Sequence, residues 1–228
     1  MTKPAPSSRH TIKKTLTALF LENDPLKICA FCASLSAENG FHPLFSLLYS
    51  QDPRIKWAAI SCMGENISLL AQIDMEKARI LMRYFIWNLN DESGGIGWGL
   101  PEAMGETLYQ SAPLAQEYHR ILISYLDPNG NYLELPLLRQ GAVWGVGRAA
   151  QRHHHLFAPA VDFLQLDLNS PITSLRGHAL WALGNLNFPD KTSLFSSFLT
   201  DENTFDLYTD HHLTALSIAT LARQILSV

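Results

Sequence analysis

Residues 52–64 read DPRIKWAAISCMG, and this segment sets the pattern of the whole chain. It begins with a turn-forming Asp-Pro pair, continues with a basic residue and two small residues, and ends at a glycine. With Gly64 as position zero, similar surroundings return at Gly105, Gly147 and Gly184, at intervals of 37 to 42 residues. Periods near 40 residues with two helices each are typical of helix-pair solenoids, in which each repeat buries its apolar face against its neighbours.

The rest of the chain continues this alternation of helices and turns. Asp24-Pro25 and Asp52-Pro53 each supply a capping acceptor and a first-turn proline. We expect Asn39-Gly40 to separate two helices and the glycine-rich segment Asn90–Gly99 to form a specially shaped loop. We predict no β-strand. The expected helices cover 9–21, 25–36, 41–49, 53–70, 75–89, a segment from 101, 113–126, 135–151, 154–166, 171–186, 191–199 and 209–226.

Composition narrows the class of protein. The 228 residues are 47% apolar and 17% charged, with a formal net charge of −4, which is typical of a globular chain without overall attraction to nucleic acid or anionic membranes. Three cysteines cannot form a fully paired disulfide set, so we expect reduced thiols and a cytoplasmic location. We expect no signal peptide and no membrane span. Residues 1–8 are predicted to be a flexible tail and residues 9–228 a single repeat domain.

A core stripe follows from the glycine frame. At 100° per residue, positions −5, −4, −1 and 0 share one face of each repeated helix. A glycine in a helix interior costs about 1 kcal/mol relative to alanine, so its return predicts that a neighbouring helix crosses close by. The stripe contains Ala59, Ile60, Met63 and Gly64; Ala142, Val143, Val146 and Gly147; and Ala179, Leu180, Leu183 and Gly184.

Residues 52–64 resemble the consensus of HEAT and HEAT-like repeats, including those of phycobilisome lyases, and residues 175–185, LRGHALWALGN, match the later half of the same unit. The resemblance implies an all-α protein, a right-handed α–α superhelix of about six helix pairs. Residues 94–106, GGIGWGLPEAMGE, with residues 139–148, RQGAVWGVGR, further resemble an uncharacterised family of small bacterial HEAT-repeat proteins. That family implies no activity, and the likeness to bilin lyases concerns the fold alone.

Position −8 is basic in three repeats, at Lys56, Arg139 and Arg176. The HEAT resemblance implies that each forms an inter-repeat pair with a turn acid such as Asp52. We therefore assign these residues a structural role.

Tryptophans and charges gather on one flank of the repeated helices, at positions −7, −3 and +1. Aromatic anchors beside charges that change from acidic to basic are what a groove for a peptide or protein segment requires. Trp98 precedes Pro101, so it can also lie in the loop. We call the candidate binding residues the tryptophan stripe. They are Trp57, Glu65, Trp98, Glu102, Glu106, Trp144, Arg148, Trp181 and Asn185.

A structural interpretation of the same stripe is equally open. The tryptophans would fill the gap between repeats, while Glu65, Glu106, Arg148 and Arg223 would form a ladder of ion pairs. Surface pairs of this kind stabilise by about 0 to 1 kcal/mol each.

Catalytic and metal-binding readings are weaker. Glu102 and Glu106, one helical turn apart beside Trp144, would serve an enzyme or a small-molecule or metal-binding protein, but no spacing supplies a third ligand. Cys29-x-x-Cys32 lacks a second cysteine pair, which favours a buried thiol. The runs His153–His155 and Asp210–His212 place consecutive side chains in different directions, so we expect surface histidines. We expect no cofactor, no bound metal and no catalytic residue.

A DNA-repair protein of HEAT-like fold would also use tryptophans and a carboxylate, but it would need a basic groove for phosphates. Glu65, Glu102 and Glu106 occupy the first half of the stripe, which argues against nucleic acid. The sequence therefore favours a non-catalytic binding or scaffold module for a protein or peptide, and it does not determine the oligomeric state.

Overall fold

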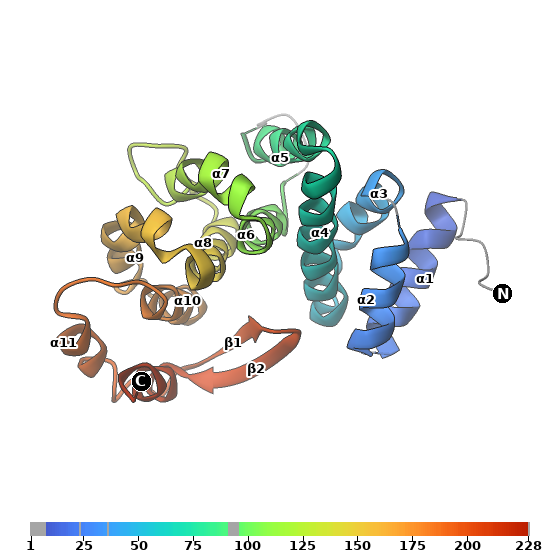
Figure 1. Ribbon diagram of the computed structural model, residues 1–228. Helices are drawn as coiled ribbons and strands as arrows, with labels where there is room; N and C mark the ends of the chain where they lie inside the picture. The colour runs from blue at the N-terminus through green and yellow to red at the C-terminus, as the bar shows by residue number, and fades with distance from the viewer. Residues whose placement is uncertain (1–7, 23, 36, 91–95, 228) are drawn as a thin grey trace.

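The computed structural model describes residues 8–22, 24–35, 37–90 and 96–227 (Figure 1). These residues are mostly helical and carry one two-stranded sheet. The predicted tail residues 1–7 and the loop residues 91–95 lie outside the described residues. The elements are α1 Arg9–Glu22, α2 Pro25–Ser34, α3 Ala37–Leu47, α4 Pro53–Ile73, α5 Met75–Asn90, α6 Leu100–Gln110, α7 Ala112–Ser124, α8 Pro136–Phe157, the 3-10 helix η1 Ala158–Ala160, α9 Val161–Asp167, α10 Thr173–Gly184, α11 Lys191–Ser196, β1 Thr204–Thr209, β2 His212–Ser217 and α12 Ile218–Leu226.

The two Asp-Pro helix starts are confirmed. The Asp24 carboxylate accepts from the backbone N–H groups of Leu26 and Lys27, and the Asp52 carboxylate accepts from that of Arg54 at 2.9 Å. Each proline occupies the first turn, where its missing N–H would have no helical partner.

Helices α4, α6, α8 and α10 form an inner row in which each packs on the next. The intervening helices α5 and α7 lie on the other side and contact two inner helices each (Figure 1). The predicted core stripe lies along the inner row. Its alanine, isoleucine, leucine, methionine and valine side chains are at most 1% exposed, so that prediction is confirmed.

At each recurrent glycine the next helix passes close by, as predicted. A Cβ atom added at Gly64 would lie 2.9 Å from the carbonyl carbon of Glu106, and one at Gly147 would lie 2.8 Å from the Cα of Ala182. Such distances are shorter than real Cβ contacts, so a larger residue would push the helices apart. Gly105 meets the backbone of α8, and Gly184 meets a side chain of α12.

The predicted helix over 209–226 is wrong in its first half. Residues 204–217 form an antiparallel hairpin with Thr209 opposite His212, and only residues 218–226 are helical. Asp210 and His211 have φ angles of 48° and 68°, the left-handed geometry that a two-residue hairpin turn requires. Threonine, phenylalanine and tyrosine in β1 favour a strand. The prediction that no strand forms is therefore also wrong.

Two helix boundaries also differ from expectation. Asn39-Gly40 does not lie between two helices as predicted, because α3 starts at Ala37 and runs through both residues. Helix α8 continues past residue 151 with a non-helical residue at His153 (φ −130°, ψ 39°), and the predicted helix over 154–166 is replaced by the end of α8, η1 and α9.

Candidate functional site

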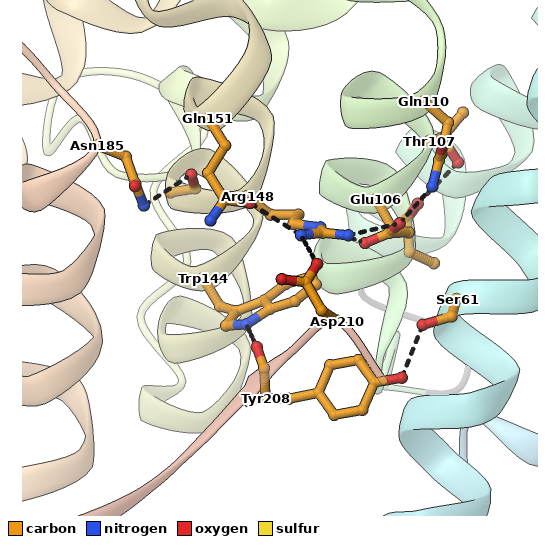
Figure 2. A network of polar contacts seen from close by, with 12 residues as sticks. Ser61, Glu106, Thr107, Gln110, Trp144, Arg148, Gln151, Asn185, Tyr208 and Asp210 are labelled. Carbon is orange, nitrogen blue, oxygen red and sulfur yellow. Dashed lines mark hydrogen bonds and ion pairs between the residues drawn. The ribbon is translucent and has the colours of Figure 1, made fainter. Parts of the chain in front are cut away.

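The C-terminal hairpin extends from α12 toward α4 (Figure 1). Its residue Tyr208 covers part of the tryptophan stripe. The ring of Tyr208, on β1, stacks on Trp57 with centroids 4.6 Å apart and an interplanar angle of 8°. The indole N–H of Trp144 donates to the Tyr208 carbonyl oxygen at 2.9 Å, and the Tyr208 hydroxyl lies 2.9 Å from the Ser61 hydroxyl (Figure 2). The centre of the predicted groove is therefore occupied by a segment of the same chain.

Arg148 lies at the centre of a fully partnered polar cluster (Figure 2). Its Nε donates to Glu106 Oε2 at 2.8 Å, and its Nη1 donates to Gln151 and to Asp210 in the hairpin turn. Its guanidinium carbon lies 3.6 Å from the ring centroid of Tyr109. Burial disfavours the charged form of Arg148, but the charge and hydrogen bonds of Glu106, together with the hydrogen bond to Asp210, outweigh it, and the pKa of Arg148 is raised. This part of the stripe matches the structural interpretation.

The remaining residues of the stripe and of the predicted ladder have different surroundings. Trp181 stacks on Trp144, with centroids 6.1 Å apart, and thus extends the aromatic row. Asn185 donates to the carbonyl oxygens of Gly147 and Trp181. Glu65 is half-buried and forms no ion pair with another described residue, and Arg223 pairs with Glu202 at the surface. The predicted ladder of four charges therefore reduces to the Glu106–Arg148 pair.

An open cavity of about 220 Å³ lies beside the covered part of the stripe. Three of the predicted binding tryptophans and Glu102 line this cavity. One of the three is Trp98, which lies in the segment before α6, as the loop alternative predicted. The hairpin contributes one acidic and one apolar residue to its wall. The lining residues are Pro53, Lys56, Trp57, Trp98, Gly99, Glu102, Leu137, Gln140, Gly141, Trp144, His178, Asp206 and Leu213.

Only one carboxylate oxygen of Glu102 has a hydrogen-bond partner. Its Oε1 accepts from Lys56 Nζ at 2.8 Å, but its Oε2 is buried without a hydrogen-bond partner. Gly141 of α8 faces this carboxylate, and a Cβ there would collide with Oε2. The glycine therefore makes room for the acid and supplies no donor to it.

His178 also lines this cavity and carries a second unpaired acceptor. Its Nδ1 lies 2.6 Å from the Ser174 carbonyl oxygen, so Nδ1 carries the proton and Nε2 presents a lone pair. This Nε2 is buried without a partner. Burial lowers the pKa of His178 to about 4, so the ring is neutral at pH 7.

His178 was not among the predicted site residues, although a sequence signal existed. Position −6 of the glycine frame reads Ala58, Gly99, Gly141 and His178, so one repeat carries an imidazole where the others carry small residues. An ionisable side chain at a position that is otherwise small is a recognisable departure.

The basic residues at position −8 all form ion pairs, as the structural assignment expected. The partner of Lys56 lies on the next inner helix instead of in a turn, whereas Asp52 pairs locally with Arg54. The pairs are Lys56–Glu102, Arg139–Asp167 and Arg176–Asp201.

The described residues also bear on metal binding, on the cysteine and histidine predictions and on membrane spans. No group of three or more histidine, cysteine or acidic side chains is placed to hold a metal ion there. Cys32 is buried, as predicted. His154, His155, His211 and His212 are exposed as expected, whereas the surface prediction is wrong for His153, which is half-buried with its Nε2 buried. Across the described ranges no helix is both long enough and apolar enough to cross a membrane.

Two larger hollows, of about 520 and 510 Å³, lie between α10 and α12 and around α11. Neither contains a buried polar side-chain atom that lacks a partner, and Lys191 in the first donates to two backbone carbonyls. The smaller cavity is therefore the stronger candidate site.

No protein-family model matches the chain, and a comparison with curated proteins finds no significant match.

Proposed function

We propose that this chain is a non-catalytic binding module, a HEAT-like α–α superhelix of about six helix pairs that holds a protein or peptide segment on its inner helices. The successive packing of α4, α6, α8 and α10, with a glycine at each crossing, supports this architecture. Repeat proteins commonly use such an inner surface for binding.

The observation that carries the proposal is that the inner helices already hold an extended segment, β1. Trp144 donates to a backbone carbonyl, a contact that recognises an extended chain regardless of its side chains. Tyr208 and Asp210 then add an aromatic and a charged anchor. A partner segment would enter beside the hairpin, where Trp98 and the open cavity lie. Glu102 and Asp206 at this opening oppose a phosphate backbone, so the proposed partner is not a nucleic acid.

Capture from cell extract, followed by cross-linking at the inner helices, tests this function with two matched substitutions. Trp98→Ala removes a half-buried ring at the cavity, whereas Trp87→Ala removes an exposed ring on α5 that does not line the cavity. We expect a protein captured by the unmodified chain and by Trp87→Ala, cross-linked near the cavity and lost from Trp98→Ala. Capture that survives Trp98→Ala would contradict the proposal.

The second candidate, a small-molecule-binding protein or enzyme using Glu102 and Glu106 beside Trp144, is favoured only at Glu102. Glu106 is committed to Arg148 and Gln110, whereas Glu102 keeps an unpartnered oxygen. Native mass spectrometry of the purified chain tests this candidate, since a copurifying compound lost from Glu102→Gln would favour it over segment binding.

A further inference from the structure

Two residues that line the cavity beside the hairpin carry unpaired acceptors. Within the described ranges, six side chains hold a buried polar atom without a hydrogen-bond partner, and two of them, Glu102 and His178, line this one cavity. Leaving a buried acceptor unpaired is unfavourable, because the atom has lost its water and gained no donor. Both atoms accept and neither donates, so the complementary group must carry N–H or O–H donors.

The charge of the lining favours a cation. Glu102 and Asp206 bring two negative charges against the single positive charge of Lys56, and the buried His178 ring is neutral. Lys56 is already engaged with Glu102 Oε1 and lies 5.6 Å from the centroid of Trp57. Tryptophan faces attract cations further.

The size of the cavity limits the ligand. Pockets for drug-sized molecules occupy roughly 300 to 1,000 Å³. At about 220 Å³, this cavity accommodates one small head group. A guanidinium is planar, stacks on aromatic rings and carries five N–H donors in a fixed fork, whereas an ammonium is a compact charge with strong hydration.

We propose that this cavity binds a guanidinium group, which donates to Glu102 Oε2 and His178 Nε2 between the tryptophan rings. The group belongs either to a small molecule or to an arginine side chain of a bound segment. Only the second source rests on the function proposed above.

Titration of the full chain with methylguanidinium, followed by tryptophan fluorescence and by the nitrogen resonances of His178, tests the site. Methylurea is the matched neutral probe. We expect saturable binding of methylguanidinium, at least about tenfold weaker binding of methylurea, and a shift of the Nε2 resonance. Equal binding of the two probes, or no saturable response to methylguanidinium, would overturn the proposal, the latter indicating that the acceptors are satisfied by water.

Two substitutions locate the effect. Glu102→Gln removes the proposed acceptor charge, whereas Glu117→Gln makes the same change at another ion-paired glutamate, on α7 and outside the cavity. We expect methylguanidinium to bind at least about tenfold more weakly to Glu102→Gln and unchanged to Glu117→Gln. Trp98→Leu is a second cavity variant should Glu102→Gln fail to fold. Equal weakening by Glu102→Gln and Glu117→Gln would overturn the assignment.

A comparison of acetyl-arginine amide with methylguanidinium distinguishes the two sources, with acetyl-citrulline amide as the neutral control. Tighter binding of the arginine amide than of methylguanidinium indicates a peptide side chain, and equal binding indicates a free small molecule. If the guanidinium probes bind while capture from extract recovers no protein, the segment-binding function fails and the cavity site stands.

Discussion

Glu102 and Glu106 lie one turn apart on α6, both at most 4% exposed, yet their surroundings differ. Both oxygens of Glu106 accept hydrogen bonds, from Arg148 and Gln110. Only one oxygen of Glu102 accepts, from Lys56. The cause lies on α8, where Arg148 faces Glu106 but Gly141 faces Glu102. A buried acid with a full set of donors holds helices together, whereas one opposite a glycine keeps capacity for a ligand.

Removal of Arg148 should have the largest effect. Arg148→Ala leaves Glu106 buried without its cation, so we expect a loss of about 3 to 5 kcal/mol in the free energy of unfolding. The same change at Arg223, whose ion pair with Glu202 is exposed, should cost less than about 1 kcal/mol. Urea denaturation measures both. Equal losses would show that the Glu106 cluster is no more structural than a surface pair.

On the cavity side, His178 should make the free energy of unfolding depend on pH. The pKa of His178 is about 4 in the folded chain and 6.5 ordinarily, so the unfolded chain binds more protons between these values. The contribution of His178 is complete above pH 6.5 and is lost as pH falls toward 4. We expect Phe in place of His178 to remove about 2 to 3 kcal/mol of the pH dependence between pH 7 and 4.5. His155→Phe, at an exposed histidine, is the control and should leave that dependence intact.

Two glycines compare the two acids directly. In Gly64→Ala the new methyl meets the backbone of Glu106, so α4 and α6 must separate, at an expected cost of about 1 to 3 kcal/mol. In Gly141→Ala the methyl meets the end of the Glu102 side chain, which can rotate into the cavity. We expect a smaller loss there, measured by thermal unfolding. A larger loss at Gly141 would mean that Glu102 is held as rigidly as Glu106.

Two buried tyrosines extend the comparison to hydroxyl groups. The Tyr208 hydroxyl has Ser61 as a partner, whereas that of Tyr125 is buried without one. Tyr208→Phe should therefore cost about 1 kcal/mol, and Tyr125→Phe should be neutral or stabilising. The difference is read from urea denaturation midpoints. The reverse order would show that the unpaired atoms of this protein are satisfied by ordered water.

Local signals predicted much of the helical framework. Asp52-Pro53 marks a helix start because the capping acceptor and the fixed proline act within one turn. The glycine frame located the helix crossings because each inner helix repeats the same face toward the next one. The pairing of Lys56, Arg139 and Arg176 followed from the HEAT resemblance, although the partner of Lys56 was not the expected turn acid.

The site was only partly predictable because it depends on contacts distant in sequence. Trp57 and Tyr208 stack across about two thirds of the chain, and no local pattern near either residue indicates the other. The hairpin was missed because its turn, Asp210-His211, lacks the glycine that usually marks left-handed geometry. Glu102 and Glu106 were predicted as equals, since only the three-dimensional positions of Lys56, Gly141 and Arg148 distinguish them.

The order of the elements along the chain gives the hairpin a temporal role. A ribosome delivers α4, α6 and α8 before β1 exists, so Trp57 and Trp144 emerge without the strand that covers them. The arrival of residues 204–217 then covers these two rings, so the hairpin closes over helices that were made before it.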